Sequence, residues 1–378
     1  MNVLFMFAGV LIVYLIVKLV FRYNWSKGLS VDVMFDKSHA VKGETRELVE
    51  VVTNNKRLPL PCINLKFQIG RELVFVNSDT NSSVSDKTYR NDVFSFLANQ
   101  RITRRIPVKC TRRGVFRISG LELTFSGPFM NEINVMKFDN NCEITVFPKA
   151  AEVNRLNPVN SRVMGEVERR KFLLEDPFVF RGIRDYNSND SLKNVNWRAT
   201  ARTGNLMVNE FDESVSRNVC ILLNLEEDGA LRYDSVSEEA ISVASGMAQM
   251  LIAQGVSVSV ICNGRDIDTR EQTVITRGSG MGHLNSINAA LARIDLDIPM
   301  EEYSDMLGRL IIEGNPDRHN DNCVYVVVSA SRRRKLQEVL SEIAVKQDDF
   351  VWIVPHLPGC EYELEYCNIT PIGWSVNN

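Results

Sequence analysis

Residues Val219-Cys220-Ile221-Leu222-Leu223 form an uninterrupted apolar run near the middle of a chain of 378 residues. A strand with one solvated face alternates apolar and polar residues, whereas a continuous run is typical of a strand that is covered on both faces. Strands of that kind occur in mostly parallel sheets with helices on either side. The run therefore predicts an α/β domain in the C-terminal part of the chain.

A helical pattern follows this run. Ser235 and Glu238 have the spacing of a capping box, in which two side chains satisfy free amide groups at the start of a helix. Gly255 stands where such a helix would end. The apolar residues between them repeat at helical spacing, on the face formed by Ile241, Ala244, Ala248 and Leu251.

Strand and helix patterns continue to alternate toward the C-terminus, which predicts a doubly wound, mostly parallel sheet. The expected elements are strands at 256–262, 323–329 and 350–354, and helices at 283–294, at 303–313 and after a capping Ser331.

The N-terminal part has a different period. Between residues 31 and 148, short segments alternate apolar and polar residues, as half-buried strands do, and turn residues such as Lys42-Gly43 separate them. About seven such strands without helical periodicity predict a β-sandwich of about 115 residues. The clearest strand patterns are at 31–35, 47–52, 64–69 and 142–147.

The first segment, residues 3–21, is apolar apart from Lys18. A helix of this length covers about 28 Å at ~1.5 Å per residue, close to the thickness of a bilayer core. We therefore expect a transmembrane helix that also serves as contact with the lipid bilayer. The alternative is a cleaved signal peptide, which is favoured less because no basic region precedes the run and no small-residue cleavage site follows it.

The side of the membrane is predicted from charge and cysteine usage. Basic residues follow the helix, which places the rest of the chain in the cytoplasm. Eight cysteines occur without a C-x-x-C pair, mostly inside apolar runs, which is typical of buried, reduced thiols. We expect a single-pass protein of the inner or cytoplasmic membrane, with cytoplasmic soluble domains.

The composition and motifs favour no catalytic class. Hydrophobic residues make up 44% and charged residues 24%, as in ordinary globular proteins, and the net charge of −3 does not favour a nucleic-acid partner. The four histidines are far apart, and the common hydrolase, zinc and P-loop motifs are missing. We expect no enzyme activity and no cofactor; a hydrolase whose residues meet only in space stays an alternative.

The segment 181–211 carries the most specific pattern in the chain. Arg184-Asp185-Tyr186 is followed by Asp190, Trp197-Arg198 and Ala201-Arg202, and the segment ends in a strand pattern up to Glu210. This order resembles the signature of the bacterial family called domain of unknown function 58. The α/β part likewise resembles the von Willebrand factor A domain that this family carries.

The resemblance implies a membrane-associated partner of MoxR-type AAA+ ATPases with no established enzymatic activity. We therefore expect an adaptor or scaffold that contacts such an ATPase or its clients. The candidate binding residues are Arg184, Asp185, Tyr186, Asp190, Trp197, Arg198 and Arg202. The expected parts are an anchor with an interfacial edge (1–27), a β-sandwich (28–150), a polar connector with the signature (151–217) and the A-like domain (218–378).

The resemblance also raises the question of a metal ion. Von Willebrand A domains bind Mg²⁺ through a D-x-S-x-S motif after the first strand, with carboxylate and hydroxyl oxygens as ligands. Here the corresponding run is Asn224-Leu225-Glu226-Glu227-Asp228, and Ser329-Ala330-Ser331 adds no acid. We expect no metal site. The alternative function is a metal-dependent protein-ligand receptor that uses Glu226 and Asp228.

The local chemistry of the signature predicts how it folds. Asp190 is expected to cap a short helix through Trp197, and Gly204 to end it. Val195 and Ala199 are expected to face inward, with Trp197 beside them.

Charge allows two interpretations of the same segment. A basic face could bind an acidic partner, since arginine forks bind carboxylates in bidentate fashion. Alternatively, Arg184 and Arg202 pair internally with Asp185, Asp190 or Glu210, and the interleaving of the charges favours this second interpretation. A basic run at 332–334, in the first turn of a predicted helix, opposes the helix dipole and is either a contact surface or a solvated face.

Overall fold

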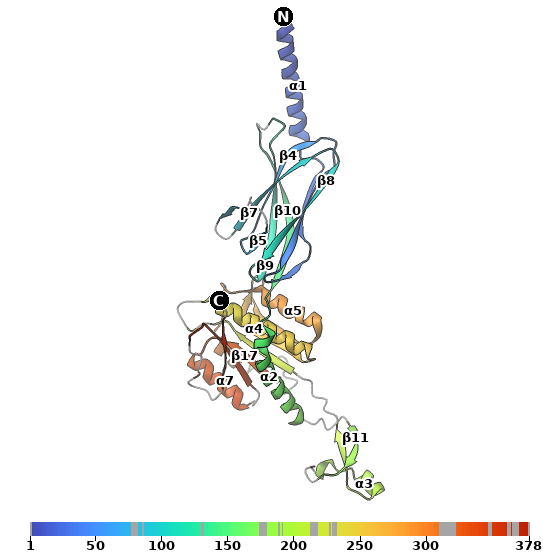
Figure 1. Cartoon of the computed structure of the whole chain (residues 1–378), viewed down its shortest axis with the longest axis vertical. Helices are drawn as coiled ribbons and strands as arrows, with labels where there is room; N and C mark the ends of the chain where they lie inside the picture. The colour runs from blue at the N-terminus through green and yellow to red at the C-terminus, as the bar shows by residue number, and fades with distance from the viewer. Residues whose placement is uncertain are drawn as a thin grey trace. The chain divides into compact units, whose positions relative to one another are not determined.

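A computed structural model describes residues 2–76, 82–84, 87–129, 132–173, 180–187, 190, 192–211, 218–226, 228, 233–309, 323–346, 350–360, 364 and 370–376. The chain divides into two compact units, Met1–Lys149 and Ala150–Asn378 (Figure 1). Each unit has its own buried apolar core, as expected of a multidomain chain.

Unit 1 begins with helix α1, Asn2–Asn24, whose residues are mostly apolar and include no proline. Its segment Phe5–Asn24 is long and apolar enough to cross a membrane, a property that a signal sequence shares, and no part of that stretch is buried. The end of the helix is nevertheless part of the fold. Phe21 and Trp25 stack on Phe125 at ring-centroid distances of 5.8 Å each, and Trp25 is only 6% exposed.

Ten strands follow in the described part of unit 1, where the sequence predicts about seven. They form a four-stranded sheet in the order β1-β3-β8-β5 and a six-stranded sheet in the order β2-β10-β9-β4-β7-β6. Their bounds are β1 Leu29–Phe35, β2 His39–Val41, β3 Thr45–Asn54, β4 Leu60–Gly70, β5 Leu73–Phe75, β6 Ser82–Val84, β7 Lys87–Phe96, β8 Gln100–Cys110, β9 Gly114–Phe125 and β10 Asn134–Phe147.

Along strands of unit 1, side chains alternate between buried and exposed, as the alternating sequence pattern predicts. Strands β1 and β7 bury every second residue along their whole length, and the four clearest strand predictions fall inside β1, β3, β4 and β10. Inward residues from both sheets join in one apolar core. The strands β2, β5 and β6 have only three residues each, which is too short for a clear alternating pattern in the sequence. Strand β2 pairs in parallel with the end of β10.

A charged cluster lies inside unit 1. Glu50 on β3 is fully buried, with its Oε1 3.7 Å from Nε of Arg90, and neither carboxylate oxygen has a hydrogen-bond partner. Arg90 and Arg104 instead bind Asp92, the latter with an Nη1–Oδ1 distance of 2.7 Å. Burial, and then the nearby charge of Asp92, raise the pKa of Glu50 to about 8.

Unit 2 contains a mostly parallel sheet with helices on both faces. Strands β14, β13, β17, β18 and β19 run parallel in this order, and β15 and β16 pair antiparallel with β14. The bounds are α2 Val153–Leu173, β13 Asn218–Asn224, α4 Asp234–Ala253, β14 Ser257–Asp266, β15 Gln272–Gly278, α5 Gly280–Arg293, β16 Ile294–Asp295, α6 Tyr303–Arg309, β17 Cys323–Ser329, α7 Arg334–Lys346, β18 Phe350–His356 and β19 Ile372–Ser375.

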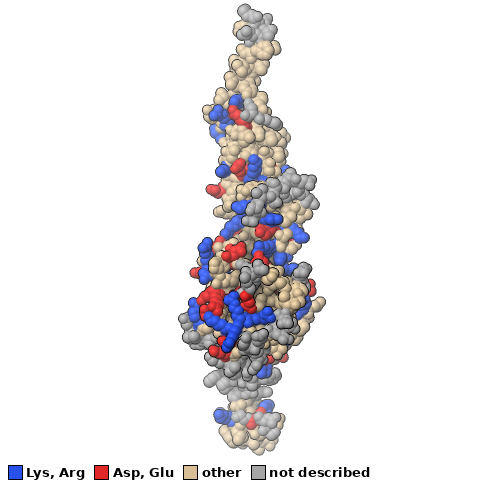
Figure 2. Space-filling view, turned by 90° about the vertical axis from the view of Figure 1, so that its left-hand side faces the viewer, with Lys and Arg blue, Asp and Glu red and all other residues tan. Residues whose placement is uncertain are grey.

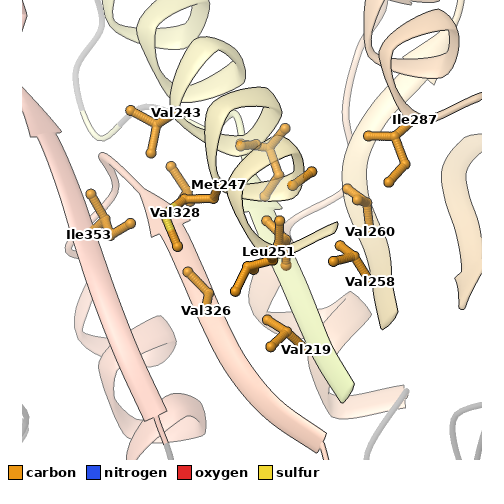
Figure 3. Close-up of a cluster of buried hydrophobic side chains, with 14 of the residues drawn as sticks. Val219, Val243, Met247, Leu251, Val258, Val260, Ile287, Val326, Val328 and Ile353 are labelled. Atoms are coloured by element: carbon orange, nitrogen blue, oxygen red, sulfur yellow. The ribbon is translucent and has the colours of Figure 1, made fainter. Parts of the chain in front are cut away.

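The apolar run of β13 is covered on both faces, as predicted. Val219, Ile221 and Leu223 belong to the core under α2, α4 and α5, while Cys220 and Leu222 belong to the core under α6 and α7. Figure 3 shows side chains of α4 and α5 pointing at those of the strands in the first of these cores. All four residues of the predicted face of α4 are buried.

Three local predictions were wrong. The expected polar connector contains helix α2, whose Leu156, Val159 and Val163 are buried in the core of unit 2. The expected capping box is replaced by an N-cap at Tyr233 without a side-chain cap bond. Ser331 does not cap α7, because the helix begins three residues later, at Arg334, and the Ser331 hydroxyl donates to the Asp228 carboxylate. The end of the helix predicted at 303–313 lies outside the described residues, beyond Arg309.

A pair of helical glycines tests the packing of α2 on α4. A Cβ added at Gly246 would lie 2.6 Å from Cδ1 of Leu156 and 3.0 Å from the backbone nitrogen of Ala151, whereas a Cβ at Gly165 meets nothing within 4 Å. We expect Gly246→Ala to lower the unfolding free energy by about 1–3 kcal/mol and Gly165→Ala to raise it by about 0.5–1 kcal/mol. Equal effects of the two substitutions in urea unfolding would contradict the packing described here.

The buried Glu50 makes unit 1 sensitive to pH. Because its pKa is raised in the folded state, its contribution to stability is present at low pH and is lost as the pH rises from about 4.5 toward 8. We expect Glu50→Gln to slow hydrogen exchange in β3 much more at about pH 9 than at about pH 5. Glu47→Gln, on the exposed side of the same strand, is the control. A gain at Glu50 that does not change with pH would rule out this interpretation.

Candidate functional site

The loops after β13 and β17 meet at one edge of the parallel sheet. The chain leaves β13 for its neighbour β14 on one side, while β17 lies on the other side and leads on to β18. In open α/β sheets, ligands bind at such a switch point, outside the carboxyl ends of the strands. Residues that follow these strands are therefore the first candidates for a functional site.

Asn224, the last residue of β13, organises this edge and is 1% exposed. Its amide Nδ2 donates to the hydroxyl of Ser329 at 3.0 Å. Its Oδ1 accepts both from the backbone nitrogen of Glu226 and from Nδ2 of Asn263, each at 2.9 Å. Asn263 in turn accepts from the backbone nitrogen of Leu225 at 2.9 Å. The Asn224 side chain thus fixes the start of the acidic loop and has both amide atoms engaged.

The two described carboxylates of the loop share one arginine. The guanidinium of Arg333 donates from Nη1 to Oε1 of Glu226, and its Nε lies 3.4 Å from Oδ1 of Asp228. Arg333 comes from the loop just before α7, more than a hundred residues later in the chain. Its positive charge lies between the two acids, where an ion-binding loop would hold its cation.

The two carboxylates also accept hydrogen bonds from other residues. Asp228 accepts from the hydroxyl of Ser331 at 2.5 Å and from the backbone nitrogen of Arg332 at 2.6 Å. The second oxygen of Glu226 accepts from the backbone nitrogen of Tyr303 at 3.2 Å. The acidic loop is therefore bonded to both α6 and the α7 approach.

These residues do not fit the Mg²⁺ ion that the sequence resemblance raises. Such an ion needs oxygen ligands in octahedral geometry. The oxygen of Asn224 already accepts two hydrogen bonds, and Glu226 and Asp228 are engaged by Arg333. The described residues contain no group of three or more acidic, histidine or cysteine side chains placed for a metal; Glu227 lies outside them.

The basic run at 332–334 is paired rather than free. Arg333 binds the acidic loop, and Nε of Arg334 donates to Oε1 of Glu338 at 2.7 Å along α7. Figure 2 shows Lys and Arg atoms beside Asp and Glu atoms on the face it presents, so charges of both signs are interleaved there. The unfavourable placement of arginines at a helix start is offset by these carboxylates.

The signature segment forms a small hairpin with two short helices. Strands β11, Phe180–Asp185, and β12, Met207–Phe211, pair antiparallel, and the 3₁₀-helix η1, Leu192–Asn194, and the helix α3, Trp197–Thr203, lie between them in sequence. Val195 and Val208 face each other across an isolated bridge and are the buried residues of this segment in its described part.

Asp190 closes a turn instead of capping the helix. It binds Arg184 with both carboxylate oxygens at 2.7 Å and accepts from the backbone nitrogen of Asn187 at 2.7 Å. These bonds lower the pKa of Asp190 to about 2. The cap of α3 is Asn196, whose Oδ1 accepts from the backbone nitrogen of Ala199, and the helix ends at Gly204 with a φ of +78°, as predicted.

Of the other candidate residues, Asp185 accepts from Nη1 of Arg184 through its backbone carbonyl oxygen at 3.1 Å. Trp197 is 68% exposed, which corrects the prediction that it lies beside an inward face. Arg198 and Arg202 are exposed as well, Asp185 is exposed, and Tyr186 is half-buried. The segment thus joins one predicted pair, Arg184 with Asp190, and presents Trp197 and two arginines to the surroundings.

Sequence reasoning missed Asn263 and the pairing role of Arg333. A signal was present for the first, because a polar residue follows the buried apolar residues of three neighbouring strands, at Asn224 of β13, Asn263 of β14 and Ser329 of β17. No local pattern identifies which of the three neighbouring arginines reaches the acidic loop, since that depends on the direction in which the chain enters α7.

The described histidines make local contacts. Nε2 of His283 lies 2.7 Å from the carbonyl oxygen of Val258, and Nδ1 of His356 lies 3.0 Å from that of Leu357. His39 stacks on Phe147. His319 lies outside the described residues, and the hydrolase alternative stays a prediction.

Titration with Mg²⁺ tests whether Arg333 takes the place of a metal ion at this edge of the sheet. We expect detergent-solubilised protein to give no saturable heat with Mg²⁺ up to millimolar concentration, because Arg333 already pairs with both acids and offsets half of their negative charge. Arg333→Met, which frees Glu226 and Asp228, is expected to bind divalent cations more tightly than the unaltered chain. Saturable Mg²⁺ binding by the unaltered chain in calorimetry would show that the arginine does not replace the ion.

Comparisons with known proteins add the following. None of the curated proteins compared with the chain matches it. Among solved structures, a CARDB domain from Pyrococcus furiosus is 14% identical and covers 31% of this chain and 91% of its own, with a TM-score of 0.21. A non-cellulosomal cohesin from Archaeoglobus fulgidus is 12% identical, with the same coverages and a TM-score of 0.22. Likenesses this distant support no argument about function. Residues 182–353, from β11 to β18, match the family described as Protein of unknown function DUF58, which confirms the resemblance of the signature segment to that family.

Proposed function

We propose that this protein is a membrane-anchored, non-enzymatic adaptor that binds a MoxR-type AAA+ ATPase or its client proteins. In this proposal α1 spans the cytoplasmic membrane once and both units lie in the cytoplasm. Unit 1 is a β-sandwich that carries unit 2, and unit 2 is a von Willebrand factor A-like domain that presents the binding surface.

The exposure of Trp197 carries the proposal. A tryptophan that is 68% exposed contributes little to the fold of its own segment. Trp and Arg are the residue types that most often dominate the binding energy of protein interfaces, and Arg198 and Arg202 are exposed on the same short helix. The DUF58 signature is therefore a contact surface as well as a structural element in this proposal.

The edge of the sheet supports an adaptor over a metal-dependent receptor. A receptor of that kind would hold its ligand through a cation bound at the loops after β13 and β17. Here Arg333 binds the carboxylates of Glu226 and Asp228 that would hold it. Recognition at this edge would therefore use a preformed, hydrogen-bonded protein surface.

The anchoring of α1 rests on two further observations. Phe5–Asn24 is mostly apolar and none of it is fully buried, as expected of a helix that contacts lipid. Trp25, directly after it, is buried in the core of unit 1 against Phe125. Cleavage near the end of α1 would separate Trp25, which is part of the core of unit 1, from the helix that positions it. This contact therefore favours a retained anchor over a cleaved signal peptide.

Binding to a purified MoxR-type ATPase from the same genome tests the proposal. We expect the detergent-solubilised protein to bind it, and Trp197→Ala to weaken binding by at least about 30-fold, which corresponds to ~2 kcal/mol for an interface anchor. Met281→Ala, at a 70% exposed position of α5, is the matched control and is expected to bind normally. Biolayer interferometry with and without nucleotide measures both.

Two outcomes contradict different parts of the proposal. Failure of the unaltered protein to bind in any nucleotide state argues against the ATPase as partner. Normal binding by the Trp197→Ala variant would leave the partner in place and remove α3 from the interface.

A further inference from the structure

The connection between β9 and β10 lies against the middle of helix α1. The ring of Phe129 is 4.7 Å from that of Tyr14, between centroids. Nζ of Lys18 is 2.6 Å from Oε1 of Glu132. Two separate contacts, one apolar and one ionic, therefore fix the described ends of this connection to two successive turns of the helix.

The same connection exposes large apolar side chains. In this connection, of which two residues are not described, Phe129 is 47% exposed and Ile133 74% exposed, and Val135 at the start of β10 is 50% exposed. Leu97, in the neighbouring connection between β7 and β8, is 71% exposed. Single exposed apolar residues are ordinary, but a group at one end of a unit indicates a surface that is covered by something apolar.

Leu97 belongs to the same end of unit 1 as α1. Its carbonyl oxygen accepts from Nδ2 of Asn54 at 2.9 Å, and Asn54 pairs with Leu29, a few residues after the helix. Strand β9 likewise ends near the helix, because Phe125 stacks on Phe21. The exposed apolar residues thus belong to the end of unit 1 at which α1 meets the strands.

The length of the helix places this end at the membrane. A span needs about 20 residues to cross ~30 Å of hydrocarbon, and Phe5–Asn24 supplies that number. The residues before Tyr14 in this span, from Phe5, cover only about 14 Å at ~1.5 Å per residue. Because these residues are too few to cross alone, Tyr14 and the loop that packs on it must lie within the depth of the bilayer if α1 spans it.

The ionic contact agrees with a position near the headgroups. With the Lys18–Glu132 pair at the headgroups, Phe129 lies one helical turn, about 6 Å, deeper, within the ~5–10 Å to which interfacial elements insert. A charged side chain at that level costs less when it is paired, and the stem of Lys18 can reach the interface.

We propose that Phe129 and Ile133, the described apolar residues of the β9–β10 connection, insert into the leaflet that surrounds the C-terminal half of α1 and contact lipid. This inference rests on the proposed membrane span and adds a second, non-helical contact with the bilayer. Unit 1 is then held at the membrane surface by both elements, because the loop is bonded to the helix and immersed beside it.

Lipid photocrosslinking tests the inference on the full chain. A photoreactive phenylalanine analogue is placed singly at position 129, 133, 12 or 89, and the protein is reconstituted in vesicles of phosphatidylethanolamine and phosphatidylglycerol. Ile12, 56% exposed on α1, reports the span, and Tyr89, 42% exposed on β7, is the aromatic control away from the helix. Intact-mass analysis after illumination counts lipid adducts.

We expect adducts at positions 12, 129 and 133, each at least about tenfold above position 89. Adducts at position 12 but not at 129 and 133 would overturn the inserted loop while leaving the span in place. Absence of adducts at position 12 would overturn the span itself, and the inserted loop with it.

Discussion

A single arginine that bridges two carboxylates sets the character of the switch point in unit 2. Arg333 binds Glu226 and Asp228, and the side-chain oxygen of Asn224 accepts a hydrogen bond from the backbone nitrogen of Glu226 in the same loop. The sheet is built as in proteins that place a ligand at this edge, but the position between the loops is taken by a side chain of the chain itself. What the edge offers to another molecule is therefore its outer polar surface and not an open coordination site.

Much of the fold could be predicted from sequence because burial pattern determines it. The run 219–223 lies under helices on both faces, and the alternating segments of unit 1 form half-buried strands. Polar segments were harder to assign. Helix α2 has charged residues on its outer side, so its buried stripe of Leu156, Val159 and Val163 was overlooked in a segment predicted as a connector.

The candidate site, too, could be predicted only in part. Its acidic loop was identified through the resemblance to a metal-binding motif that follows the first strand, and the internal pair of Arg184 with Asp190 by short-range charge complementarity. The partner of the acidic loop could not be found in this way, because it lies about a hundred residues away. The exposure of Trp197 was not predicted, because helical spacing shows only which residues share a face of a helix. A helix of two turns beside a two-stranded hairpin has little apolar core in which such a face can be buried.

A double-mutant cycle between Glu226 and Arg333 tests most directly whether the arginine stands in for the ion. Glu226→Gln, Arg333→Met and the double variant are compared by urea unfolding of unit 2 in the presence of Mg²⁺ and of a chelator. We expect a favourable coupling of at least about 0.5 kcal/mol, larger than that of the helix-surface pair Arg334–Glu338 and the same in both solutions. A coupling near zero, or one that appears only with the chelator, would contradict the account.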